Sequence, residues 1–75
     1  MSLYDVKLNT DCIVKELKIA DEKMKIRIME LGLNVGSVLR VKSKSVLKKT
    51  FLIVFHSSCF TLKDDVAKMI LVNYV

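Results

Sequence analysis

The chain has 75 residues, of which 52% are hydrophobic, with two glycines, no proline and a formal net charge of +5 at pH 7. This length predicts one domain over residues 1–75, and the composition is typical of a packed globule rather than a disordered segment. Since no apolar run reaches the roughly 18 residues that span a bilayer, and the N-terminus lacks a signal-peptide layout, we expect a cytoplasmic protein.

A strand and a helix are the first elements predicted. Residues 12–19 alternate apolar and charged side chains imperfectly, which indicates a strand with an irregularity. Residues 20–31 should form a helix, because Met24, Ile28 and Leu31 recur at the spacing of one core-facing stripe. The helix is therefore expected to pack its stripe against the sheet.

Capping residues mark both ends of this helix. Asp21 can accept hydrogen bonds from the free N–H groups of the first turn. Gly32 follows the helix where a left-handed residue is favoured. After Gly36 the apolar spacing changes from helical to alternating, so we predict a second strand over residues 37–43.

The segments that follow, residues 44–62, predict a β-hairpin. A polar, lysine-rich connection, residues 44–49, precedes the strongly β-prone residues 50–56. Ser57 and Ser58 are the predicted turn, and residues 59–62 resume an extended pattern.

Two blocks of the chain resemble a known family. Residues 27–41, RIMELGLNVGSVLRV, resemble the RLxELGLxxGxxLxV signature of the FeoA family, small cytosolic accessory proteins of bacterial ferrous iron uptake. The residues that match the signature motif include Arg27, Glu30, Leu31, Gly32, Leu33 and Gly36. Residues 62–72, LKDDVAKMILV, resemble the family's closing segment. This resemblance implies that Asp64 and Asp65 begin a short helix and that residues 69–72 form the last strand.

The predicted fold is mostly β. About five short strands cannot stack into two large sheets, whereas a partly open barrel would cover most strand edges. The resemblance implies a small SH3-like, partly open barrel with one inserted α-helix and a short C-terminal helical turn. The side chains predicted to point inward are Val14, Leu17, Ile28, Leu31, Leu39, Val41, Phe51, Ile53, Phe55, Phe60, Leu62, Ile70 and Val72.

The outward face of residues 50–56 carries two apolar side chains, Leu52 and Val54, where polar ones would be expected. The inserted helix could cover that face, or the face could bind a partner protein.

Four lysines, Lys42, Lys44, Lys48 and Lys49, cluster on the second strand and its following loop. This cluster could contact nucleic acid, an anionic membrane surface or an acidic protein, or it could be a solvated loop. Nucleic-acid binding usually needs aromatic side chains among the charges, and the nearest one, Phe51, is predicted to point inward.

No catalytic or metal constellation is evident, so we expect no enzyme activity and no cofactor. A catalytic pair could only form around the single histidine, His56, whose serine neighbours adjoin it along a hairpin. His56 and Cys59 are weak metal candidates, two ligands short of a tetrahedral site. Cys12 and Cys59 are expected to be reduced, buried thiols.

The resemblance implies an accessory protein that docks on the cytosolic, GTPase-bearing part of a membrane ferrous iron transporter and modulates it. We expect docking through Leu52, Val54, Lys48 and Lys49, by a monomer that is peripheral to the membrane at most and binds no nucleic acid. The alternative is a small basic barrel that binds nucleic acid through its lysine loop.

Overall fold

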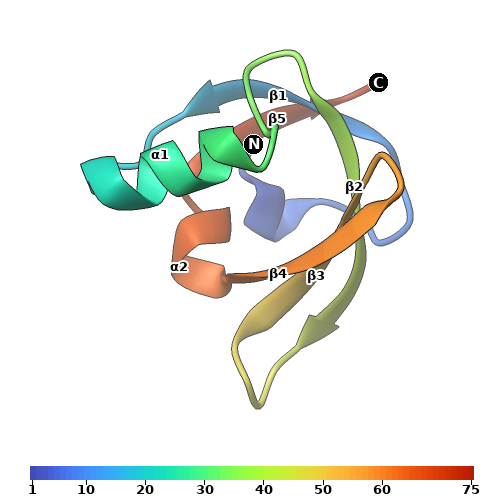
Figure 1. Ribbon diagram of the computed structural model, residues 1–75. Helices are drawn as coiled ribbons and strands as arrows, with labels where there is room; N and C mark the ends of the chain where they lie inside the picture. The colour runs from blue at the N-terminus through green and yellow to red at the C-terminus, as the bar shows by residue number, and fades with distance from the viewer.

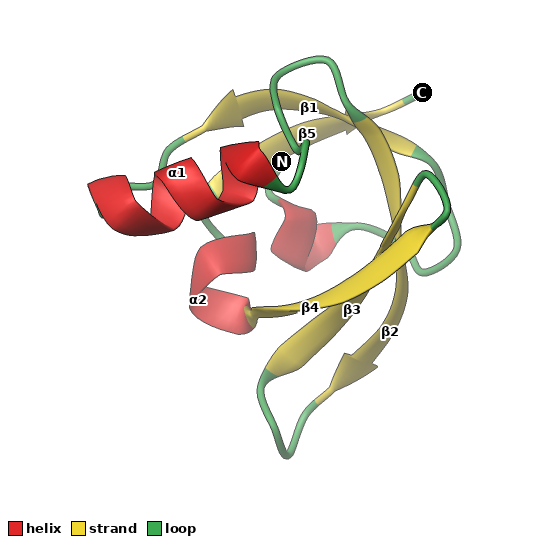
Figure 2. Ribbon diagram, viewed as in Figure 1, coloured by secondary structure: helices red, strands yellow, loops and turns green.

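The computed structural model describes all of residues 1–75. Its elements in chain order are the 3₁₀ turn η1 (Leu3–Asp5), β1 (Cys12–Leu17), α1 (Glu22–Glu30), β2 (Val38–Ser45), β3 (Thr50–Phe55), β4 (Ser58–Lys63), α2 (Asp64–Ala67) and β5 (Ile70–Tyr74). The five strands form one antiparallel sheet in the order β4-β3-β2-β1-β5 (Figure 1). The sheet curves around the core and leaves β4 and β5 as its edges, with the helices at the open side (Figure 2). The predicted mostly β fold, with one inserted helix and a short C-terminal helix, is confirmed.

Two register shifts help to bend the sheet. One lies on β1 between Val14 and Glu16, where β1 pairs with β5, and it confirms the irregularity predicted for the first strand. The other lies on β2 between Val41 and Ser43. Beyond this shift β2 continues to Ser45, two residues past the predicted end, because its last residues still pair with β3. The lysine-rich connection therefore shrinks to residues 46–49.

Helix α1 starts directly after Asp21 and ends before Gly32, as the two capping residues predicted, but it is shorter than the predicted residues 20–31. The Asp21 Oδ1 atom accepts hydrogen bonds from the backbone N–H groups of Lys23 (3.0 Å) and Met24 (3.4 Å). At the other end, Gly32 has a φ of 95°, and the Leu33 N–H donates to the Ile28 carbonyl at 3.2 Å. This arrangement is a Schellman motif, in which the chain reverses direction and Leu33 packs back toward Ile28.

One prediction for the core is wrong. Leu31 is 53% exposed, because it is the C-cap of α1 and the following turn places Leu33 in the core instead. Leu17 and Phe60 are only partly buried and pack against the core, whereas the other predicted inward residues are buried. The buried core consists of Leu3, Val6, Cys12, Val14, Ile19, Ile28, Leu33, Leu39, Val41, Phe51, Ile53, Phe55, Leu62, Val66, Ala67, Ile70 and Val72.

The N-terminal segment contributes to this core although no element was predicted there. Leu3 is fully buried and Val6 nearly so. The Met1 carbonyl accepts a hydrogen bond from the Val72 N–H at 2.8 Å, and Ser2 pairs with Leu71 of β5. Residues 1–6 therefore cover β5 and the interior of the barrel.

The β3–β4 turn lies one residue earlier than predicted. Its two residues are His56 and Ser57, since Phe55 and Ser58 already pair across the hairpin. His56 takes the left-handed position with a φ of 54°, a conformation in which histidine is enriched among non-glycine residues. The hairpin is as expected, but a histidine fills the place where a glycine is common.

Candidate functional site

Two adjoining hollows lie between the α1–β2 loop and the β3–β4 turn, and we call them together the loop groove. The first hollow is lined by Gly32, Val35, Gly36, Ser37, Val38, Phe55 and His56. The second is lined by Asp11, Val38, Leu39, Arg40, Val54 and His56. Because Val38 and His56 line both, the hollows form one continuous surface. It contains both glycines of the signature motif.

Hydrogen bonds fix the loop on one side of this groove. The Ser37 Oγ donates to the Gly32 carbonyl at 3.2 Å and accepts from the Asn34 N–H at 3.0 Å. The loop is also tied to β1, since the Gly36 N–H donates to the Val14 carbonyl at 2.8 Å and the Val14 N–H donates to the Ser37 backbone carbonyl at 2.9 Å. The motif therefore builds a defined wall rather than a loose connection.

An ion pair forms the rim of the second hollow. The Arg40 Nε lies 2.6 Å from the Asp11 Oδ1, and both side chains are about half exposed. The hydrogen bond from Arg40 lowers the pKa of Asp11 below its ordinary value, so the carboxylate is ionised and paired at neutral pH. The rim thus offers both charge signs beside apolar side chains.

Apolar side chains form much of the floor. Val35 and Val38 are exposed, and Val54 is half-buried beside them. The groove therefore joins an apolar floor to a charged rim, which is the usual anatomy of a protein interface.

The inserted helix does not cover the outward face of β3. Phe51, Ile53 and Phe55 alternate into the core, and α1 adds Ile28 to that same core. Leu52 and Val54 therefore face the other side of the sheet and are half-buried by their neighbours in β2 and β4. The possibility that the helix covers them is excluded.

The four predicted partner-binding residues fall in two places. Val54 lines the loop groove near the end of β3, and Leu52 lies on the same face. Lys48 and Lys49 lie in the turn before β3 begins, at the opposite end of a strand about 20 Å long. The structure therefore places the two apolar side chains and the two lysines on separate parts of the surface.

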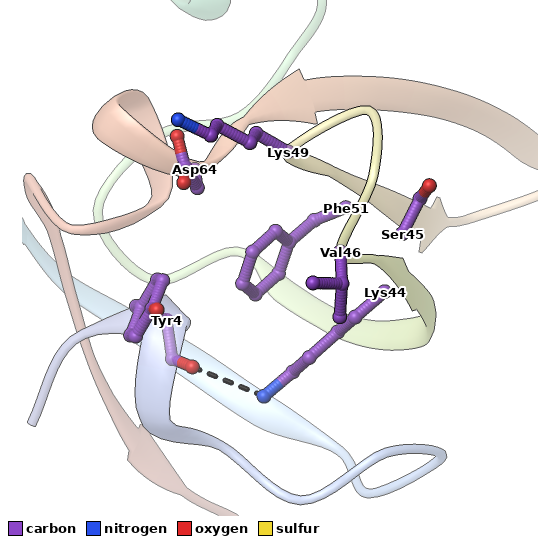
Figure 3. A pocket seen from close by; sticks show the side chains of 7 residues that line it. All are labelled: Tyr4, Lys44, Ser45, Val46, Lys49, Phe51 and Asp64. Carbon is purple, nitrogen blue, oxygen red and sulfur yellow. Dashed lines mark hydrogen bonds between the residues drawn. The ribbon is translucent and has the colours of Figure 1, made fainter.

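Lys44, which belongs to the same lysine cluster, has a structural role. Its Nζ donates hydrogen bonds to the carbonyls of Tyr4 (3.0 Å) and Val6 (3.4 Å), and it lies 5.2 Å from the centre of the Phe51 ring. Figure 3 shows this ammonium group reaching across a pocket of about 330 Å³ toward the N-terminal segment. Lys68 lies 4.7 Å from the centre of the Tyr4 ring, so a cation already contacts that aromatic face.

The cysteines differ in environment. Cys12 is buried, its Sγ donates to the Leu39 carbonyl at 3.4 Å, and burial raises the pKa of its thiol. Cys59 is exposed, so the prediction of two buried thiols is wrong for this residue: its side chain lies on the solvent face of the edge strand β4. Both cysteines are free.

No three His, Cys, Asp or Glu side chains gather where they could hold a metal ion together. His56 and Cys59 are therefore at most two ligands of an incomplete set. Titration calorimetry with ferrous iron or zinc should accordingly detect no stoichiometric site of micromolar or tighter affinity. A tight site lost in the His56→Ala variant would contradict this prediction and make the chain a metal carrier.

None of the helices is long and apolar enough to cross a membrane.

Known proteins with this fold identify the family. The sequence model of the FeoA domain matches residues 1–74, and no curated protein matches the chain. The solution structure of FeoA from Chlorobium tepidum superposes with a TM-score of 0.91 at 24% identity, covering 100% of this chain and 70% of that one. Zinc-complexed FeoA from Stenotrophomonas maltophilia, described as a prokaryotic SH3 domain protein and candidate activating factor of ferrous iron transport, gives 0.82 at 26% identity, covering 97% and 89%.

The same fold occurs within a larger protein. A manganese-dependent transcriptional repressor in complex with manganese gives a TM-score of 0.90 at 20% identity, and the alignment covers 100% of this chain but 36% of the repressor. That likeness shows a shared fold alone. The family match over 74 residues, together with the five-stranded SH3-like sheet, shows that the chain belongs to the FeoA domain family.

Proposed function

We propose that this chain is a non-enzymatic cytoplasmic accessory protein of ferrous iron uptake. In this proposal the monomer docks on the cytosolic, GTPase-bearing part of a membrane ferrous iron transporter and modulates its activity. The observation that carries the proposal is the FeoA domain match over residues 1–74. The description of the Stenotrophomonas maltophilia relative as a candidate activating factor of ferrous iron transport supports the same role.

The loop groove is the docking surface in this proposal. Its floor offers Val35, Val38 and Val54 for burial against a partner, and the Asp11–Arg40 pair on its rim can orient that partner.

A charge placed in the groove should disrupt docking. We expect the Val54→Asp variant to lose at least about tenfold in affinity for membranes that contain the transporter, because an unpaired carboxylate would be buried in the interface. Retention should be measured on membranes with and without the transporter, and the difference between them is the quantity compared. Ile26→Asp, on the exposed side of α1, is the matched control and should bind like the wild type.

Two outcomes would contradict the proposal. One is retention of the wild type that does not depend on the transporter. The other is strong, salt-sensitive binding to oligonucleotides that the Lys48→Glu, Lys49→Glu variant loses, which would favour the nucleic-acid alternative.

A further inference from the structure

The turn between β2 and β3, residues 46–49, displays two apolar side chains at its apex, and we call these four residues the hairpin tip. Val46 is 88% exposed and Leu47 is 97% exposed, which makes them the two most exposed large hydrophobic side chains of the chain. The loop groove lies at the other end of β3 and does not include them. The docking proposed above therefore leaves the tip unoccupied.

The tip is held in a fixed shape. Ser45 and Thr50 pair at its base, and the Lys48 N–H donates to the Ser45 Oγ at 3.3 Å. The Asp64 N–H donates to the Lys49 carbonyl at 2.9 Å, which ties the tip to the start of α2. In Figure 1 the tip projects from the bottom of the molecule, away from α1. Val46 and Leu47 are thus presented on a rigid projection.

Positive charge surrounds this apex. Lys48 and Lys49 belong to the tip, and Lys63 lies beside them, because it pairs with Thr50 at the end of β4. Asp64 is the acidic side chain of the adjoining pocket, on the same rim as Lys49 (Figure 3). Three lysines against Asp64 and its neighbour Asp65 still leave the tip basic, in a chain whose net charge is +5.

We propose that the hairpin tip binds anionic lipid bilayers by inserting Val46 and Leu47 among the headgroups, with Lys48 and Lys49 contacting lipid phosphates. Apolar side chains at a convex apex fit the boundary between headgroups and acyl chains, and the negative potential of an anionic leaflet attracts the lysines around them. A nucleic-acid site would need no exposed valine and leucine at its centre. This proposal does not rest on the transporter, although a tip seated in lipid leaves the loop groove free to reach a membrane protein.

Co-sedimentation with vesicles tests the tip directly. The wild type should bind vesicles of phosphatidylcholine with phosphatidylglycerol, should bind pure phosphatidylcholine weakly, and should lose binding as salt is added. Val46→Ser with Leu47→Ser removes the apolar apex without changing charge, and we expect it to weaken binding by about tenfold or more.

Charge-reversal variants distinguish binding by the lysines of the tip from a general effect of the protein's net charge. Lys48→Glu with Lys49→Glu should weaken binding to anionic vesicles by at least about tenfold. The control Lys15→Glu with Lys23→Glu changes the net charge equally, on exposed positions of β1 and α1, and should retain most of the binding.

Three results would overturn the proposal. They are no binding of the wild type to anionic vesicles, equal loss in both charge-reversal variants, or unchanged binding by the Val46→Ser, Leu47→Ser variant. Analytical ultracentrifugation adds a further test. If the wild type self-associates and the Val46→Ser, Leu47→Ser variant does not, while both bind vesicles equally, the tip is a contact between copies of this chain. The vesicles contain no protein, so these results are independent of transporter docking.

Discussion

Replacing Leu3 by alanine is expected to lower the free energy of unfolding by about 2–5 kcal/mol. Leu3 is fully buried, and the backbone of its segment is hydrogen-bonded to β5. Neighbouring side chains therefore cannot easily move to fill the cavity that the substitution leaves. Domains of this size are stable by only a few kcal/mol, and a loss of this size would leave much of the protein unfolded at physiological temperature. Urea denaturation followed by circular dichroism measures the change.

Leu47 provides the matched control for this substitution. The same change of leucine to alanine at a side chain that is 97% exposed should alter stability by less than about 0.5 kcal/mol. Equal denaturation midpoints for Leu3→Ala and the wild type would show that the N-terminal segment is not part of the core.

Gly32→Val should destabilise the domain by about 1–2 kcal/mol through the backbone alone, because a φ of 95° is unfavourable for a residue with a β-carbon. A second effect adds to this one. A β-carbon at Gly32 would lie 3.2 Å from the Phe55 Cε2, so the ring must shift within the core. Thermal unfolding should therefore show a fall of several degrees in the melting midpoint.

The Gly36→Val variant separates the cost of backbone strain from the cost of displacing the Phe55 ring. Gly36 has nearly the same φ, 94°, but a β-carbon there meets no atom within 4 Å. Its variant should show the backbone cost without the displaced ring, and so a smaller fall. An unchanged midpoint for Gly32→Val would mean that α1 does not end on this glycine.

Local signals in the sequence predicted the elements well. Asp21 and Gly32 marked the ends of α1 because capping depends on residues within one turn of each other. The helical periodicity wrongly placed Leu31 in the core. Leu31 is the C-cap, and the chain reverses direction at the next residue, Gly32, which the periodicity does not reveal. Leu33, two positions later, occupies the core instead.

Contacts distant in sequence could not be predicted in this way. Leu3 lies in a stretch without periodicity, and its burial depends on residues about 70 positions later. The sequence around Lys44 indicates a solvated lysine, yet its Nζ donates hydrogen bonds to the Tyr4 and Val6 carbonyls. The loop groove could not be predicted from the sequence, because Asp11, Arg40 and Val54 come from three separate segments.

The pairing of β1 has a consequence for how the chain is made. Both of its neighbours come from later in the sequence, with Cys12 beside Leu39 of β2 and also beside Tyr74 of β5. During synthesis from the N-terminus, one edge of β1 stays unpaired until residues 70–74 have left the ribosome. Until then the N-terminal segment that carries Leu3 also lacks β5, the strand it pairs with. Contacts of this span form slowly, and an unpaired edge invites aggregation. The barrel therefore closes only once its final strand is available, and until then the unpaired edge of β1 is the place where the nascent chain is open to wrong pairing.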